Sequence, residues 1–209
     1  MDMNVPIILD GKKVANEIAE DLKKRCEILK ANHIFPKLII FTNTDDASKV
    51  YVRNKVKRCE EIGIKAVTYP ISKFEDFNIA DKDCDCCETP YILQEPSNLT
   101  KFQNTVFVDQ YYHTDVDGFS ASNLGKLFKN EEKDGLTYFK ACTPKGIITL
   151  LDYYNIPIEG RKVVILGRSN IVGRPMAAMM LNRDATVSVC HTKTLQMTFI
   201  DEIWSADII

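Results

Sequence analysis

The sequence predicts an α/β protein made of two units, each built around a parallel sheet. Strand-like and helix-like segments alternate over residues 7–71, and the same alternation returns after residue 141. A third observation is the turn GRSNIVGRP, residues 167–175, which joins an apolar run to a helical segment. Strands that alternate with helices favour a parallel sheet. The 209 residues suffice for one large domain or two small ones.

The first third of the chain has the clearest periodicity. Apolar residues recur at helical spacing over residues 12–30 and predict an amphipathic helix. Around it the pattern predicts, in order, a strand at 7–11, a strand at 35–43, a helix at 48–62 and a strand at 65–71. Residues 72–113 are weakly patterned, and here we expect strands at 91–96 and 104–109 with no helix between them.

A second unit begins near residue 141. Thr143 followed by Pro144 predicts a helix over residues 141–154, with threonine as the N-cap and proline in the first helical position. There follow a strand at 162–166, a helix at about 173–182, a strand at 185–190, a further helix, and ADII as the start of a third strand. This order is the beginning of a doubly wound fold.

Composition argues against several classes of function. The net charge is −2, with acidic and basic residues interspersed, so nothing indicates a nucleic acid or a membrane surface as a partner. No apolar run approaches the roughly 20 residues that a membrane-spanning helix needs. The start, MDMNVPIILDGKK, has the layout of neither a signal peptide nor a transit peptide, so we expect a cytoplasmic protein.

The seven cysteines are scattered, except for Cys84, Cys86 and Cys87 in DKDCDCCE. No second Cys or His pair stands at the spacing of a zinc site. We therefore expect reduced thiols in a polar loop and no metal site, as is usual in the cytosol.

The stretch GRSNIVGRP predicts a phosphate-binding turn between a strand and a helix. Gly167 has no side chain to keep a phosphate away from the backbone, and the next helix directs free N–H groups and its positive dipole end towards the anion. Gly173 allows close packing on the strand or on the ligand. The same pattern also fits an ordinary strand-to-helix connection that binds nothing.

The end of the following strand favours NADP over NAD. NAD sites usually carry an acidic residue about 20 positions on, which binds the ribose 2′-hydroxyl. Here the strand ends in CHTKT, which supplies His191, Thr192 and a lysine but no carboxylate. With Arg168 in the turn, a 2′-phosphate finds a cation and hydroxyls, whereas a bare 2′-hydroxyl lacks its acidic partner.

The stretch SKVYVRNK places Ser48, Tyr51 and Lys55 at i, i+3 and i+7, on one face of a helix. A phenol one turn away can position an amine, which must lose its proton to act as a base near neutral pH. The same spacing also fits a lysine that is merely solvated and has no catalytic role. Gln94 and Asp117 have similar structural explanations: Gln94 fits an amide at the end of a strand, and Asp117 fits an Asp-Gly turn.

Together these motifs resemble the bifunctional methylenetetrahydrofolate dehydrogenase/cyclohydrolase family of one-carbon metabolism. The matching stretches, in the family's order, are SKVYVRNKVKRCEEIGI, DVDGFSASNLGKL, CTPKGIITLL, GRSNIVGRP and ATVSVCHTKT. The resemblance implies an N-terminal α/β folate-binding catalytic domain at residues 1–140, and a linking helix with an incomplete Rossmann-like NADP-binding domain at residues 141–209. It implies that NADP⁺ oxidises 5,10-methylenetetrahydrofolate and that the methenyl product is hydrolysed to 10-formyltetrahydrofolate, in support of purine biosynthesis.

The resemblance also implies a role for each matched residue. Lys55 is the acid/base group of the cyclohydrolase, Gln94 hydrogen-bonds it, and Tyr51 stacks on the folate. Ser48 and Asp117 complete the substrate-binding residues, with Asp117 on the pterin ring. The implied cofactor-binding residues are Gly167, Arg168, Ser169, Gly173, His191 and Thr192.

The chain departs from the family pattern at three places. LQEPSNL stands where the family usually has Val-Gln-Leu-Pro-Leu-Pro, the acidic FEDFNIADKDCDCCE replaces an expected helix, and Thr114 replaces a basic residue before DVDG. The family also continues past ADII with further strands, a Pro-Gly-Gly-Val-Gly-Pro segment and a terminal helix. We therefore expect these residues to be a fragment or a truncated product, whose full-length form is a homodimer.

Three alternatives stay open. A monofunctional dehydrogenase is one, although the presence of Lys55 argues against it. A non-catalytic product that binds folate or pairs with an intact subunit is another. A different NADP-dependent dehydrogenase that shares only the glycine turn would leave SKVYVRNK and DVDGF unexplained.

Overall fold

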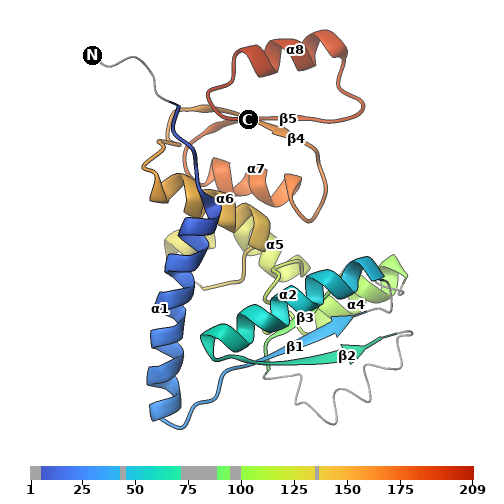
Figure 1. Cartoon of the computed structure of the whole chain (residues 1–209). Coiled ribbons are helices and arrows are strands. Elements are labelled where there is room, and N and C mark those ends of the chain that lie inside the picture. The colour runs from blue at the N-terminus through green and yellow to red at the C-terminus, as the bar shows by residue number, and fades with distance from the viewer. Residues whose placement is uncertain (1–5, 43–45, 72–88, 95–99, 135–136) are drawn as a thin grey trace. The chain divides into compact units, whose positions relative to one another are not determined.

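A computed structural model of the chain describes residues 6–42, 46–71, 89–94, 100–134 and 137–209. The chain divides into two compact units. One runs from Leu22 to Cys142, and the other joins the residues up to Asp21 with Thr143–Ile209. Each unit contains its own parallel sheet (Figure 1). The structure therefore confirms the predicted α/β class.

The unit from Leu22 to Cys142 is built on three parallel strands in the order β2-β1-β3 (Figure 1). The strands are β1 (Lys37–Thr42), β2 (Lys65–Pro70) and β3 (Tyr91–Leu93). The helices are α1 (Gly11–Ala31, which begins in the other unit), α2 (Asp46–Ile62), α4 (Lys101–Gln110), α5 (Ala121–Lys129) and the 3-10 helix η1 (Glu131–Asp134). A parallel bridge between Tyr91 and Asp115 extends the sheet beyond β3.

An apolar cluster on one face of this sheet forms the core of the unit. Ile39 and Phe41 lie two residues apart on β1, so both side chains point to the same face. Phe107 of α4 packs edge-on against Phe41, with 5.3 Å between the ring centroids. All three side chains are at most 2% exposed. The helix α4 is therefore an integral part of the core.

The presence of α4 means that the strand predicted at residues 104–109 was wrong. Thr100 caps the helix: its hydroxyl accepts from the N–H of Gln103 at 3.2 Å, and its own N–H donates to Oε1 of Gln103 at 3.0 Å. This reciprocal capping box fixes the start of a helix. Phe107 is buried whereas Val106 is 38% exposed, which is the one-sided burial of a helix rather than of a central strand.

The strand predicted at residues 7–11 was also wrong, because the described residues before α1 form no strand. Ile7 and Ile8 are 69% and 82% exposed. The carboxylate of Asp10 instead accepts from the N–H groups two and three positions on, at 3.0 and 3.1 Å. An aspartate in this position satisfies the free donors at the start of α1.

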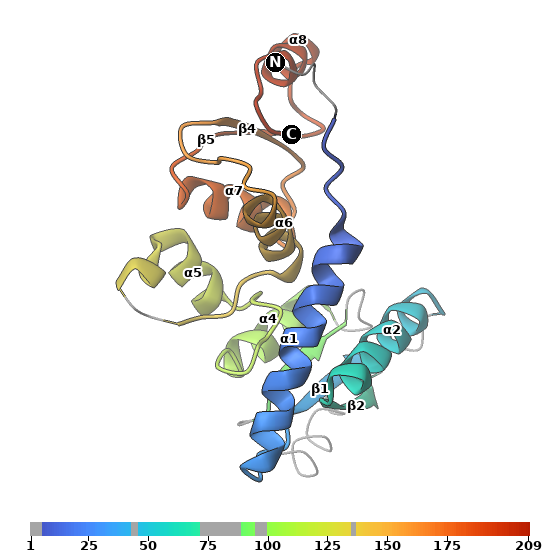
Figure 2. The ribbon, with the colours of Figure 1, turned by 60° about the vertical axis from the view of Figure 1, so that its left-hand side comes forward.

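The second unit contains the parallel strands β4 (Lys162–Leu166) and β5 (Thr186–Cys190). Its helices are α6 (Cys142–Tyr153), α7 (Gly173–Leu181) and α8 (Gln196–Trp204). The helices α7 and α8 lie on opposite sides of the strand pair (Figures 1 and 2). A parallel bridge from Val163 to Ile208 begins a third strand, as predicted. The helix α6 begins at Cys142, so Thr143 lies in its first turn. The prediction that Thr143 is the N-cap was therefore wrong.

The turn between β4 and α7 depends on the close approach of two glycines. A Cβ atom on Gly173 would lie 2.3 Å from the carbonyl oxygen of Gly167, which is backbone and cannot move aside cheaply. Gly167 has a φ of +123°, a value that other residues rarely adopt. Of the two roles expected for Gly173, packing on the ligand or on the strand end, the structure supports the second. None of the helices in the described part of the chain is long and apolar enough to cross a membrane.

We predict that Gly173→Ala destabilises the protein by about 1–3 kcal/mol, because the added methyl group must displace backbone. Gly146→Ala is the matched control, since a Cβ atom there meets nothing within 4 Å and alanine is favoured over glycine inside a helix by up to about 1 kcal/mol. Thermal unfolding of both variants measures the change in stability, which should be a loss for Gly173→Ala and a gain for Gly146→Ala. Equal effects would contradict the packing role of Gly173.

Candidate active site

Lys55 is held by Gln94 in the unit that runs from Leu22 to Cys142. The Nζ atom of Lys55 donates to Oε1 of Gln94 at 2.8 Å, although 39 residues separate the two. The backbone N–H of Gln94 donates to the carbonyl of Phe41 at 2.8 Å, so this residue directly continues the β1–β3 ladder. The amide that binds Lys55 is therefore fixed by the sheet itself.

Asp117 is an acidic neighbour of this pair. It follows residues 114–116, which run beside β3: the N–H of Tyr91 donates to the carbonyl of Thr114 at 2.9 Å, and the N–H of Val116 donates to that of Tyr91 at 3.3 Å. Asp117 and Gln94 therefore both follow segments that end at the carboxyl edge of the sheet. The ammonium charge of Lys55 acts on the Asp117 carboxyl at this edge.

Burial raises the pKa of the Asp117 carboxyl above its ordinary value of 3.8. The charge of Lys55 opposes this rise, the nearby Asp115 adds to it, and a hydrogen bond from Cys142 lowers it again. The Cys142 thiol lies 3.6 Å from Oδ1 of Asp117 and 3.8 Å from the carbonyl oxygen of Val116. Three neighbours therefore set the charge of a half-buried acid.

Asp115 has a different task, although only Val116 separates it from Asp117. It is 2% exposed, and its carboxylate accepts from the N–H groups of Gly118 at 3.1 Å and Ser120 at 2.8 Å. The side-chain amide of Asn123 donates to it at 3.2 Å. Asp115 thereby shapes the DVDGF turn and leaves the carboxylate of Asp117 outside this network of backbone bonds.

Tyr51 lies one turn before Lys55 on α2 and is 66% exposed, so its ring is accessible to a ligand. Ser48 begins the same helical face, but its side chain lies outside the described residues. Cys84, Cys86 and Cys87 also lie outside them. Among the described side chains, no group of three or more His, Cys, Asp or Glu residues is placed to hold a metal ion.

In the second unit, Ser169 satisfies the first N–H groups of α7. Its hydroxyl accepts from the N–H of Val172 at 3.1 Å and of Gly173 at 3.4 Å, and its carbonyl accepts from the N–H of Arg174 at 2.9 Å. The next residue, Pro175, has no N–H group. These N–H groups are therefore already hydrogen-bonded in this structure, and Ser169 acts in the turn itself.

A cavity of about 520 Å³ opens where β4 and β5 end. It is lined by Leu166, Gly167, Arg168, Cys190, His191, Thr192 and Phe199. The His191 N–H donates to the Thr194 hydroxyl at 2.9 Å, and Nδ1 of His191 accepts from the Lys193 N–H at 3.2 Å, so this turn is held by its own contacts. Arg168 and Thr192 are exposed members of this lining.

Comparison with known proteins identifies both units. Residues 9–78 match the tetrahydrofolate dehydrogenase/cyclohydrolase catalytic domain, and residues 141–209 match the NAD(P)-binding domain of the same enzymes. A bifunctional protein FolD from Ligilactobacillus salivarius is 39% identical over 211 residues, covering 98% of this chain and 72% of the relative. The chain belongs to the tetrahydrofolate dehydrogenase/cyclohydrolase family.

Solved structures of this family share the fold. The bifunctional FolD enzyme from Campylobacter jejuni superposes with a TM-score of 0.86 at 36% identity, covering 97% of this chain and 72% of that one. A 5,10-methylenetetrahydrofolate dehydrogenase from the silkworm Bombyx mori gives 0.83 at 28% identity, covering 96% and 73%. The family resemblance read from the motifs is therefore confirmed.

The structure brings together most of the residues singled out in the sequence. Lys55, Gln94 and Asp117 converge in one unit, whereas Gly167, Arg168, His191 and Thr192 line the cavity of the other. The sequence reading gave no function to Cys142, to Asp115 beyond a place in an Asp-Gly turn, or to Phe199. The first two lie inside the quoted motifs CTPKG and DVDGF, but Phe199 lies in no motif and its place in the cavity required the structure.

We predict that Asp117→Asn becomes progressively more stable than the wild type as the pH rises. Because its folded-state pKa is raised, the wild-type carboxyl contributes its full stability below pH 3.8 and loses it as the pH rises through the folded-state value. Asparagine cannot ionise and still accepts from Cys142. Thermal unfolding across the acidic to neutral range measures the trend, with the exposed Glu60→Gln as the control. A constant difference would contradict the burial of Asp117.

Proposed function

We propose that the chain oxidises 5,10-methylenetetrahydrofolate with NADP⁺ and hydrolyses the methenyl product to 10-formyltetrahydrofolate. The observation that carries this proposal is the 2.8 Å hydrogen bond between Lys55 and Gln94, beside Asp117, in a chain 39% identical to a bifunctional protein FolD. Hydride transfer needs orientation rather than an acid or base. A positioned lysine therefore favours the bifunctional enzyme over a monofunctional dehydrogenase.

Lys55 is the acid/base group of the hydrolysis step. Water adds to the methenyl cation and loses one proton to solvent. The resulting hydroxyl compound then opens to the formyl product as its O–H proton is lost and the released ring nitrogen gains one, so one group must accept a proton from oxygen and deliver one to nitrogen. A lysine that donates one N–H to a neutral amide keeps its lone pair free once it is deprotonated. A carboxylate in the place of Gln94 would stabilise the ammonium form and oppose this role.

Asp117, Tyr51 and Ser48 bind the folate. Asp117 is a half-buried carboxyl that can accept from the N–H groups of a pterin ring. The ring of Tyr51 offers an exposed face for stacking. Its position one turn from Lys55 supports the assignment of this helical face to the substrate.

The NADP site comprises Gly167, Arg168, Ser169, Gly173, His191 and Thr192. Arg168 and Thr192 bind the 2′-phosphate, for which a guanidinium and a hydroxyl are suitable partners. Ser169 and Gly173 act indirectly, because they shape and satisfy the turn. The match to an NAD(P)-binding domain supports the nucleotide, and the exposed cation supports the phosphorylated form.

Three further assignments complete this proposal. The catalytic domain comprises residues 1–140, and the linking helix and NADP-binding domain comprise residues 141–209. The enzyme acts as a homodimer in the cytoplasm. Its product, 10-formyltetrahydrofolate, supplies one-carbon units to purine biosynthesis.

We predict that Lys55→Met lowers the cyclohydrolase rate by about 10²–10⁴-fold, which is the usual contribution of an acid/base group. Hydride transfer should remain measurable, because methionine keeps much of the side-chain bulk. Separate assays of methenyltetrahydrofolate hydrolysis and of NADPH formation measure the two steps. Lys57→Met, which removes an exposed lysine from the same helix, is the control. Equal loss of both activities would refute the role of Lys55.

Arg168→Ala should weaken NADP⁺ binding by about 10- to 100-fold, the range for loss of a hydrogen bond to a charged group. NAD⁺ lacks the 2′-phosphate and should be affected much less. Arg161→Ala is the control, because Arg161 precedes the same strand at its opposite end. Binding of both cofactors to each variant is measured by calorimetry. Equal weakening of NADP⁺ and NAD⁺ would show that Arg168 does not bind the 2′-phosphate.

A further inference from the structure

The helix α8 supplies one wall of the nucleotide cavity through a single aromatic side chain. Phe199 is the α8 residue that lines the cavity, and the residue is 37% exposed. None of the residues of α8 is buried. The position of Phe199 is therefore not enforced by a surrounding apolar core, and another interaction must hold the helix against the strands.

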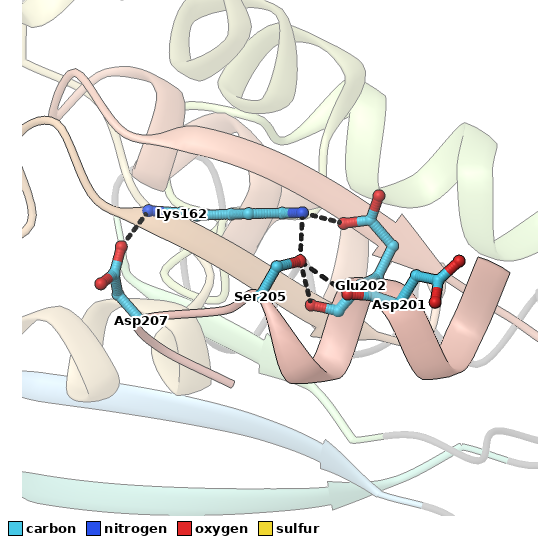
Figure 3. A network of polar contacts seen from close by, with 5 residues as sticks. All are labelled: Lys162, Asp201, Glu202, Ser205 and Asp207. Carbon is cyan, nitrogen blue, oxygen red and sulfur yellow. Dashed lines mark hydrogen bonds and ion pairs between the residues drawn. The ribbon is translucent and has the colours of Figure 1, made fainter. Parts of the chain in front are cut away.

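That interaction lies at the opposite end of β4. The Nζ atom of Lys162, the first residue of β4, lies 2.9 Å from Oε2 of Glu202 and donates to the hydroxyl of Ser205 at 2.6 Å. The hydroxyl in turn donates to the carbonyl of Asp201 at 2.6 Å. Figure 3 shows the Lys162 side chain extended along the strand, with its amine between the other two side chains. We call Lys162, Glu202 and Ser205 the α8 latch.

Two further contacts support the latch, and its two charged side chains are partly buried. The carboxylate of Asp207 accepts from the backbone N–H of Lys162 at 2.8 Å, which fixes the chain just after α8 (Figure 3). A hydrogen bond from Ser188 of β5 and the neighbouring Lys162 lower the pKa of the Glu202 carboxyl. The side chains of Lys162 and Glu202 are only 30% and 26% exposed, so salt screens their attraction less than that of a surface pair.

The helical geometry links the latch to Phe199. Glu202 follows Phe199 by three residues, so the two side chains lie on one face of α8. That face is directed at the strands, with Glu202 at the start of β4 and Phe199 at the cavity where β4 and β5 end. Fixing Glu202 therefore also fixes the direction of Phe199.

We propose that Phe199 is the surface on which the purine base of the nucleotide stacks, and that the α8 latch positions it. This inference rests on the proposed NADP site. The cavity lining combines polar residues suited to phosphate, Arg168, His191 and Thr192, with the apolar residues Leu166, Cys190 and Phe199. A planar base can pack on the apolar lining residues, and the stacking of a base on an aromatic ring is strong and tolerates any base.

The first test measures binding of adenosine 2′,5′-bisphosphate, which carries the base and the 2′-phosphate but no nicotinamide. Phe199→Ala should weaken this probe about tenfold or more, whereas Phe199→Tyr should bind like the wild type. Trp204→Ala is the matched control, because Trp204 is an aromatic residue of the same helix, is 85% exposed and does not line the cavity. Calorimetry on the full chain provides the dissociation constants.

The second test asks whether the latch acts through Phe199. Lys162→Met should weaken the probe several-fold in the wild-type background and should add almost nothing to Phe199→Ala, since coupled residues give non-additive effects. Arg183→Met is the control, because it removes an unrelated ion pair with Asp152. Its effect on binding of the probe should be the same in the wild type and in Phe199→Ala. Trp204 is the one tryptophan of the chain, and its fluorescence anisotropy should fall when the latch is broken.

The outcomes separate the two levels of the proposal. If the wild type does not bind adenosine 2′,5′-bisphosphate, both the NADP site and the stacking role are overturned. If the wild type binds it and Phe199→Ala binds equally well, only the stacking role is overturned. If Lys162→Met weakens binding equally in both backgrounds, the latch stabilises the unit in general and does not position Phe199.

Discussion

The parallel direction of the strands is the constraint on which both sites depend. Because parallel strands all end at the same edge of a sheet, the residues that follow them are brought together whatever their separation in sequence. Gln94 follows β3, and Asp117 follows the segment bridged to β3. In the other unit Gly167 follows β4 and His191 follows β5. The chemistry of each unit is therefore located at one edge, and helices α2 and α8 add Lys55 and Phe199 to it.

The two neighbouring aspartates at this edge of the sheet make different contacts, which leaves one carboxyl outside the backbone network. Asp115 is buried and uses its oxygens on backbone N–H groups of its own turn. Gly118 belongs to this turn, and its lack of a side chain permits a close approach to the backbone of Phe139, where a Cβ atom would lie 2.7 Å from the carbonyl oxygen. Asp117 then stands on a rigid turn and faces Lys55 and Cys142. Rigid support of this kind limits the reorganisation needed when substrate binds.

The sequence was sufficient for features that depend on local pattern. The parallel class, strand β4 and the turn at Gly167 all followed from periodicity and glycine placement. The sequence-based prediction failed where capping side chains change the local preference from strand to helix. Thr100 and Gln103 form a capping box that turns the β-prone NTVFVD into a helix, and Asp10 starts α1 where two isoleucines favoured a strand. Phe199 could not be found at all, because its role depends on a contact made by the fold.

The capping role of Ser169 changes how the nucleotide site should be understood. In many phosphate-binding turns the helix amides themselves bind the anion, but here the hydroxyl and carbonyl of Ser169 occupy those of Val172, Gly173 and Arg174. In the proposed site, anion binding then relies on the dipole of α7 and on side chains, chiefly the exposed Arg168. A flexible guanidinium confers less positional order than fixed amides. Another part of the cavity must therefore fix the position of the cofactor. In our proposal Phe199 of α8, held in place by the α8 latch, does this by stacking on the base.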